Sequence, residues 1–123
     1  MPVNVWLLDS HGKSIGIDKL YTKVSLADGK LQTSKGTLLP AVVETRVMNI
    51  TYVNTDSLAR TVNLYIKRDG ANSIEIISPD LSLVAGGMLV DTRLHTLEAG
   101  DVIEGDASVA DVVKYSISGV KEA

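Results

Sequence analysis

Two histidines in this chain of 123 residues lie close to aspartates, and each pair has the residue types of a metal site or of a general base held by a carboxylate. The pairs are Asp9 with His11 and Asp91 with His95. Neither pair has a third ligand at a recognisable spacing, and two side chains hold a metal only loosely. We therefore interpret both pairs as exposed polar residues.

Carboxylates recur near the end of the chain in a pattern that suggests calcium. Asp101, Asp106 and Asp111 follow one another at intervals of five residues, and Glu104 lies among them. The spacing and the glycine of an EF-hand loop are absent. We interpret the four residues as a solvated acidic edge, because charges along an exposed strand discourage uncontrolled pairing with other chains.

The sequence shows no other catalytic pattern. It contains no cysteine, which excludes disulfide frameworks, thiolate nucleophiles and zinc ribbons. Gly86 and Gly87 lack the lysine and the hydroxyl residue of a phosphate-binding loop, and no serine lies in a nucleophile elbow. We predict a non-enzymatic protein with no catalytic residue, no metal and no cofactor. A small hydrolase acting through Asp91 and His95 is the enzymatic alternative.

Tyr65 is a candidate contact residue. It alternates to the polar side of an expected strand, between Asn63 and Lys67. A tyrosine in this position offers an apolar ring with a polar tip to a ligand, and it can equally be a cross-strand packing partner.

An apolar segment opens the chain and contains its single tryptophan. Burying such a segment against a neighbouring molecule is favourable at roughly 25 cal/mol per Å². The alternative is an ordinary strand inside the domain. The interface candidates of this segment are Val3, Val5, Trp6, Leu7 and Leu8.

Composition indicates one folded domain made of strands. Hydrophobic residues make up 45% of the chain and charged residues 22%, which is typical of a globular domain. The chain has 15 Val, 9 Ile and 9 Thr, so β-branched residues occupy 33 of its 123 positions and favour strands. No apolar run approaches the roughly 20 residues of a membrane span, so we expect no membrane partner.

The charges are distributed unevenly. Residues 1–68 carry nine Lys or Arg and five Asp or Glu, for +4, whereas residues 69–123 carry three and ten, for −7. A total of −3 without a basic cluster argues against a nucleic-acid partner. The asymmetry is either scatter over a solvated surface or electrostatic matching between neighbouring copies in an assembly.

Apolar and polar residues alternate with a period of two in several short runs. In the run 46–54, the alternation places Met48, Ile50 and Tyr52 on one strongly apolar face. Turn signals such as Asp69-Gly70 separate the runs. The expected strands are 46–54, 61–67, 74–77, 81–84, 88–91, 102–107 and 112–119.

The spacing of these runs predicts the fold class. Six or seven short strands at intervals of 8 to 12 residues are typical of a sandwich or barrel. We predict an all-β protein, an antiparallel β-sandwich of jelly-roll or immunoglobulin-like topology. Within the N-terminal part, Asp28-Gly29 predicts a hairpin between runs 20–27 and 30–33. We expect residues 1–36 to form an N-terminal arm or hairpin for attachment or oligomer contacts, and residues 37–123 to form the sandwich.

Five segments together carry a family resemblance: 47–55, 59–66, 89–91, 97–103 and 107–119. A strand ending at Asn-Thr is followed by an Ala-Arg-Thr-Val strand, and a Leu-Glu-Ala-Gly-Asp turn opens the final hairpin. In these features the chain resembles small β-sandwich modules of tailed-bacteriophage virion proteins, over about two thirds of its length. The motifs are turns and strands, so no active site comes with the resemblance.

The resemblance implies a structural role in the virion. Such modules occur both in capsid decoration proteins and in tail or fibre components, so the resemblance leaves the location in the virion open. We favour a capsid decoration (cement) protein that binds and stabilises the shell, with the major capsid protein or tail proteins as partners. A sandwich this short retains apolar surface, so we also expect a homo-oligomer, with a trimer favoured. The alternatives are a tail, baseplate or fibre component, or a carbohydrate-binding β-sandwich module that uses Tyr65.

Overall fold

The computed structural model describes residues 2–4 and 20–122. In this part of the chain the regular structure consists of strands alone, with no helix long and apolar enough to cross a membrane. The strands are β1 (Pro2–Asn4), β2 (Leu20–Lys30), β3 (Gly36–Pro40), β4 (Thr45–Asn54), β5 (Arg60–Lys67), β6 (Ser73–Glu75), β7 (Leu81–Leu83), β8 (Met88–Asp91), β9 (His95–Leu97), β10 (Val102–Ala107) and β11 (Val113–Glu122).

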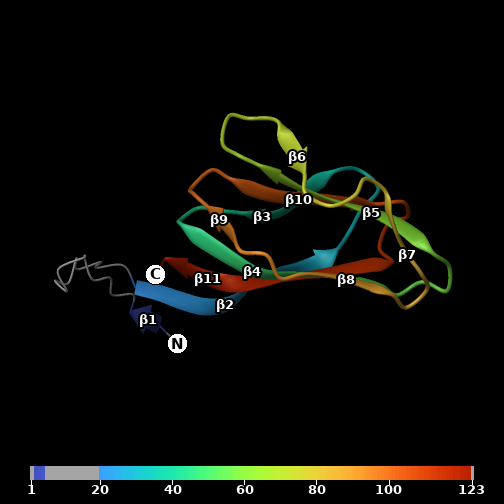
Figure 1. Ribbon diagram of the computed structural model, residues 1–123, viewed down its shortest axis with the longest axis horizontal. Coiled ribbons are helices and arrows are strands. Elements are labelled where there is room, and N and C mark those ends of the chain that lie inside the picture. Colours follow the sequence, from blue (N-terminus) through green and yellow to red (C-terminus); the bar gives the residue numbers. More distant parts are fainter. Residues whose placement is uncertain (1, 5–19, 123) are drawn as a thin grey trace.

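The strands form two antiparallel sheets that lie one over the other (Figure 1). The larger sheet has the order β1-β2-β11-β4-β8, with β9 also paired to β4. The smaller sheet has the order β3-β10-β5-β6, with β7 also paired to β5. The predicted all-β antiparallel sandwich is therefore confirmed.

The strand order is that of a jelly roll. β8 and β9 pair with different halves of β4, so together they form one interrupted edge strand. β6 and β7 pair with different halves of β5 in the same way. Counted like this, and with β1 left aside, the chain forms two four-stranded sheets, which is the jelly-roll arrangement rather than the immunoglobulin-like one.

The hydrophobic core lies between the two sheets. On β5 the alternation predicted from the sequence is confirmed, since Val62, Leu64 and Ile66 are buried while their neighbours along the strand are not. The turn predicted at Asp69-Gly70 is also present, and Gly70 has a φ of 71° there. The other buried apolar residues are Leu31, Leu38, Leu39, Ala41, Val47, Ile50, Tyr52, Leu83, Leu97, Ile103, Ala107, Val113 and Ile117.

The hairpin predicted at Asp28-Gly29 is wrong. β2 runs straight through both residues and pairs with β11, with Gly29 opposite Tyr115. A Cβ added to Gly29 would lie 2.9 Å from the hydroxyl oxygen of Tyr115. The glycine therefore makes room for an aromatic ring on the neighbouring strand, and β2 belongs to the larger sheet of the sandwich.

The face predicted for Met48 is also wrong. Ile50 and Tyr52 are fully buried as expected, but Met48 is 52% exposed and Val47 is buried in its place. Ser118 pairs with Asn49 whereas Gly119 pairs with Val47, so Met48 is the extra residue of a β-bulge. The bulge changes the phase of the alternation along β4, and the first half of the strand therefore buries the opposite set of residues.

Candidate interaction surfaces

Most of the predicted N-terminal interface lies outside the described residues. This applies to Val5, Trp6, Leu7 and Leu8. Val3 belongs to β1, which pairs with β2 at one edge of the larger sheet. The role of this segment as an interface stays a prediction.

Tyr65 lies on the outer face of the smaller sheet and is half-buried. Its hydroxyl donates a hydrogen bond to Asp106 at 3.3 Å, and the ammonium of Lys35 lies 5.0 Å from the centre of its ring. Burial and the nearby carboxylates of Asp106 and Glu75 raise the pKa of Tyr65 to about 12. The ring therefore contacts a cation of the protein itself, in the geometry of a cation–π interaction.

Carboxylates surround Tyr65 on this face. Glu104 and Glu75 are its partners on the two neighbouring strands, β10 and β6. The Asn63 amide donates to Asp106 at 2.8 Å and to Asp80 at 3.0 Å, and the Ser73 hydroxyl is hydrogen-bonded to Glu104. Burial and the charges of Asp106 and Asp80 raise the pKa of Glu75. Within residues 2–4 and 20–122, no three His, Cys, Asp or Glu side chains are arranged to hold a metal ion.

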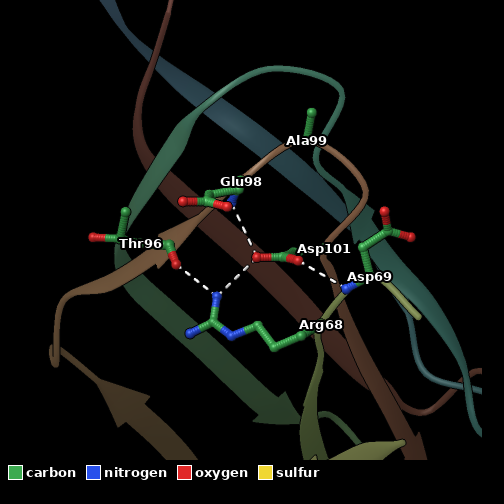
Figure 2. Close-up of a pocket in the computed structure, with 6 residues that line it drawn as sticks. All are labelled: Arg68, Asp69, Thr96, Glu98, Ala99 and Asp101. Carbon is green, nitrogen blue, oxygen red and sulfur yellow. Dashed lines mark hydrogen bonds and ion pairs between the residues drawn. The ribbon is translucent and has the colours of Figure 1, made fainter. Parts of the chain in front are cut away.

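Asp101 occupies the centre of a pocket of about 570 Å³ at one end of the sandwich (Figure 2). Its carboxylate accepts hydrogen bonds from the backbone amides of Asp69 at 2.9 Å and Glu98 at 3.0 Å, and from the Arg68 guanidinium at 2.9 Å. Burial alone would raise the pKa of Asp101, but these donors outweigh it and lower the pKa. The carboxylate thus joins the turn after β5 to the turn before β10.

The predicted solvated acidic edge is therefore wrong for Asp101, which is only 6% exposed. Glu104 and Asp106 are half-buried, and Asp111 is exposed. The sequence could not show this difference, because the Asp69 amide and the Arg68 guanidinium that hold Asp101 come from the turn after β5, far from Asp101 in the chain.

Asp91 and His95 are brought together as their spacing suggested, but they are not exposed surface residues. Asp91 is 6% exposed, and its carboxylate lies 3.0 Å from the Nε2 atom of His95. Arg93 donates to the same carboxylate from its backbone amide at 2.9 Å and from its guanidinium at 2.9 and 3.0 Å. Burial would raise the pKa of Asp91, but Arg93 and His95 lower it to about 2.

This cluster also connects the two sheets. The Arg93 guanidinium donates a hydrogen bond of 2.6 Å to the backbone carbonyl of Ile76, which follows β6 in the smaller sheet. Arg93 itself lies between β8 and β9 of the larger sheet. Asp91 thus holds Arg93 in place, and Arg93 joins the interrupted edge strands of the two sheets. The role of this cluster in the fold is structural.

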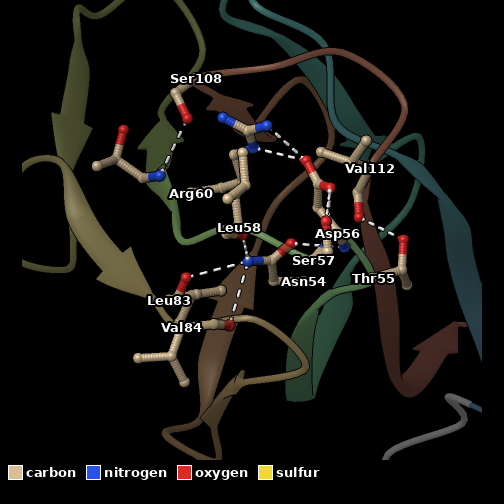
Figure 3. A network of polar contacts seen from close by, with 11 residues as sticks. Asn54, Thr55, Asp56, Ser57, Leu58, Arg60, Leu83, Val84, Ser108 and Val112 are labelled. Atoms are coloured by element: carbon tan, nitrogen blue, oxygen red, sulfur yellow. Dashed lines mark hydrogen bonds and ion pairs between the residues drawn. The ribbon is translucent and has the colours of Figure 1, made fainter.

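Asn54 is a buried polar residue whose structural role the sequence did not reveal. It ends β4 fully buried, and its amide nitrogen donates to the carbonyls of Leu58 at 2.9 Å, Leu83 at 3.0 Å and Val84 at 3.1 Å (Figure 3). Its amide oxygen accepts from the backbone of Asp56 at 2.9 Å. One side chain therefore fixes both the loop that follows β4 and the chain at the end of β7.

The polar clusters share one property. The carboxylates of Asp91 and Asp101 and the amide of Asn54 accept or donate hydrogen bonds within the protein itself. Such groups fix loops and edge strands, and they leave the outer faces and edges of the two sheets as the surfaces available for contacts.

Comparison with known sequences gives no identification. No protein-family model matches this chain. No curated protein matches it either.

Comparison with solved structures identifies the fold. A chain from the acidic stable capsid structure of Helicobacter pylori bacteriophage KHP30 superposes with a TM-score of 0.50 at 13% sequence identity, over 84% of this chain and 93% of that chain. A chain from the structure of infectious bursal disease virus, Gx strain, gives a TM-score of 0.46 at 15% identity, over 97% of this chain and 37% of that chain. The protein is thus a jelly-roll β-sandwich, and a phage capsid structure contains a chain of similar fold and size.

Proposed function

We propose that this protein is a non-enzymatic structural component of a bacteriophage virion, a capsid decoration (cement) protein that binds and stabilises the shell. The observation that carries the proposal is the likeness to a chain of a phage capsid structure over 84% of this chain and 93% of that chain. The segments that resemble tailed-phage virion modules support it independently. The buried polar clusters are consistent with a structural role, because their hydrogen bonds join loops and strands of the fold.

The partner of such a protein is the major capsid protein. The N-terminal segment attaches the protein to the shell. β1 and β2 form one edge of the larger sheet, and Asn4 pairs with Leu20 there. The apolar residues Val3 and Trp6 belong to this part of the sequence. Copies of the protein assemble on the shell as homo-oligomers with closed symmetry, and a trimer is the form we favour.

The experiment is immunogold labelling of particles from a phage that encodes this chain, with an antibody raised against the full-length protein. A decoration protein places gold over the whole capsid. Gold confined to the tail would instead support a tail, baseplate or fibre component. Unlabelled particles, together with no peptide of this chain in their mass spectrum, would overturn a virion role altogether.

A deletion mutant separates decoration from shell building. A phage without this gene should still form capsids, because a cement protein adds to a shell that is already complete. These capsids should break at lower temperature or lower salt than wild-type capsids, and purified protein should restore their resistance. If no capsid forms without the gene, the protein is a shell subunit and the decoration role is wrong.

The carbohydrate-binding alternative has a weaker basis in the structure. Tyr65 is its platform, but Lys35 lies against the ring and the hydroxyl is bonded to Asp106. A glycan array probed with wild-type protein and with Tyr65→Ala tests it. Binding that Tyr65→Ala abolishes would establish this alternative, and an array without bound glycan would remove it.

A further inference from the structure

One edge of the larger sheet carries a row of exposed apolar side chains. Met88 and Val90 of β8 are 59% and 48% exposed, and Leu94, between β8 and β9, is 61% exposed. Met48, at the bulge of the neighbouring strand β4, is 52% exposed. Soluble monomers rarely gather exposed apolar residues in this way without a partner.

The backbone of β8 is open at the same edge. β8 pairs only with β4 among the described strands. The backbone N–H of Asn54 donates to the carbonyl of Gly87 at 2.9 Å, so this carbonyl points toward β4. Successive residues of a strand direct their N–H and C=O groups to opposite sides, so those of Met88 and Val90 point away from β4. They offer hydrogen bonds to a further strand.

The other edges of the sandwich contain features that hinder pairing. Pro79 and Asp80, which has a φ of 50°, interrupt the edge formed by β6 and β7. β3 ends at Pro40, and β1 begins at Pro2. β8 contains neither proline nor lysine, and its single charged residue, Asp91, is buried. Proline and outward charges are the usual protection of an edge strand, and β8 lacks both.

We propose that β8 is a self-association strand: two copies of the protein pair β8 against β8, antiparallel about a two-fold axis, and extend the larger sheet from one copy into the other. A strand pairs antiparallel with its own copy under a two-fold rotation, so both copies contribute the same residues. Met88 and Val90 of the two copies then lie on the same outer face and pack across the axis. The charge of β8, Asp91, is buried and paired with Arg93, so an unpaired charge of this strand does not oppose the contact.

The size of the apolar row limits the strength of this contact. A stable interface buries about 800 Å² on each partner, and four side chains that are about half exposed supply only part of that area. The backbone hydrogen bonds of Met88 and Val90 must therefore contribute. We expect dimers in solution only at protein concentrations of about 100 µM and above, and stronger pairing wherever copies are held side by side.

This contact is independent of the virion role. It uses the edge of the larger sheet opposite to β1, and therefore leaves β1 free. A copy attached to a shell through its N-terminal segment can pair with a neighbouring copy through β8. The protein could decorate a shell without pairing through β8, or pair through β8 without decorating a shell. Experiments can distinguish these two outcomes.

Disulfide cross-linking tests the geometry, because the natural chain has no cysteine. The variants are Met88→Cys and Val90→Cys, with Ile74→Cys as the matched control. Ile74 is 62% exposed on β6, an edge strand of the smaller sheet. Under mild oxidation or with a short bis-maleimide linker, at least one β8 variant should give covalent dimers several-fold faster than Ile74→Cys. Equal rates for all three variants would overturn the proposal.

Sedimentation equilibrium tests the energetics in the absence of a linker. Wild-type protein should show a dimer fraction that grows with concentration, and Val90→Lys should weaken association at least tenfold. Ile74→Lys should behave as wild type. A wild-type protein that stays monomeric at 500 µM and gives no β8 cross-link would overturn the proposal, as would an oligomer that Val90→Lys leaves unchanged. Since Val90 is half exposed, the lysine variant should keep the wild-type circular dichroism spectrum, and Met88→Lys provides a second test.

Discussion

Gly119 of β11 lies beside the bulge at Met48 of β4, and a Cβ atom added to this glycine would overlap the carbonyl oxygen of Arg46. The bulge brings the backbone of β4 closer to β11 than an ordinary ladder does, and only a residue without a side chain fits opposite it. The same bulge buries Val47 and exposes Met48. Gly119 therefore determines which residues β4 contributes to the core.

Gly119→Ala tests this dependence. The added methyl meets backbone atoms of Arg46, which cannot move without breaking the ladder between β4 and β11. We expect the free energy of unfolding to fall by about 2 to 4 kcal/mol, as for other changes that strain the backbone. Chemical denaturation measures it. Gly36→Ala is the matched control, because its new Cβ would meet only a backbone oxygen at 3.8 Å. Equal stability of the two variants would show that the bulge adapts freely.

The lowered pKa of Asp91 predicts that the protein becomes less stable in acid. Its pKa is about 2 in the folded protein and 3.8 in an unperturbed aspartate. Between these pH values the unfolded chain binds more protons, so the free energy of unfolding rises with pH. The stabilisation is complete above pH of about 4 and is lost as the pH falls through about 2. It amounts to at most about 2 kcal/mol.

Denaturation curves at a series of pH values test this prediction. Asp91→Asn should be less stable than wild type at neutral pH, because Arg93 and His95 lose their charged partner. Its stability should also change less between pH 2 and pH 4. Arg93→Gln keeps the carboxylate but removes the guanidinium donors, and should flatten the same window in part. Identical slopes for wild type and Asp91→Asn would contradict the assignment.

Asn54 should be among the polar residues on which stability depends most. Its buried side chain donates to three carbonyls and accepts from the amide of Asp56. Asn54→Ala leaves these groups unsatisfied, and we expect a loss of about 2 to 3 kcal/mol in the free energy of unfolding. Asn49→Ala is the control on the same strand, since Asn49 is half-buried and accepts a side-chain hydrogen bond from Thr51. The loss for this control should stay below about 1 kcal/mol.

Tyr65 should ionise late in an alkaline titration. Its pKa of about 12 follows from burial and from the charges of Asp106 and Glu75. Since the folded state keeps this proton while an unfolded tyrosine loses it near pH 10, the contribution to stability is lost as the pH rises from about 10 to 12. Phenolate absorbance follows the titration. Tyr65→Phe should remove the step near pH 12, and Asp106→Asn should move it to lower pH. A midpoint near 10 that Tyr65→Phe removes would mean that the ring is more exposed than the structure shows.

The sequence predicted the features that depend on neighbours along the chain. The alternation of Val62, Leu64 and Ile66 and the turn at Asp69-Gly70 are local, and both are confirmed. The errors depend on partners far along the chain. Asp28-Gly29 has the residue types of a turn, but Gly29 lies in a strand, where the ring of Tyr115 packs against it. The alternation in β4 gave no sign that a bulge lies at Met48, because the glycine that permits the bulge is on β11.

The polar sites also separate into features that neighbouring residues determine and features that distant residues determine. The sequence drew attention to Asp91 and His95 as a pair, but interpreted both as exposed residues. Their burial was not visible, because Arg93 reaches the carboxylate only through a turn between two edge strands. Asp101 received the same incorrect interpretation as an exposed acid for a similar reason. Two of its three donors are backbone amides, which leave no trace in the sequence, and the third is Arg68, which is far from Asp101 along the chain.

Trp6 offers an optical test of attachment, because it is the single tryptophan of the chain. If the N-terminal segment binds the shell, the emission of Trp6 should shift to shorter wavelength and become protected from acrylamide when the protein binds capsids that lack it. Trp6→Ser should lower occupancy on these capsids at least tenfold, because buried tryptophans dominate protein interfaces. It should change the free energy of unfolding of the isolated protein by less than about 0.5 kcal/mol.

Val42→Ser is the control for this measurement, since Val42 is an apolar residue that is 78% exposed and is not among the predicted interface residues. It should leave both occupancy and stability at the wild-type values. Emission at short wavelength in the free protein, combined with a loss of several kcal/mol in Trp6→Ser, would mean that Trp6 belongs to the core of its own protomer. Attachment would then have to use another surface, because a side chain that stabilises the isolated fold has no apolar area left to offer to a shell.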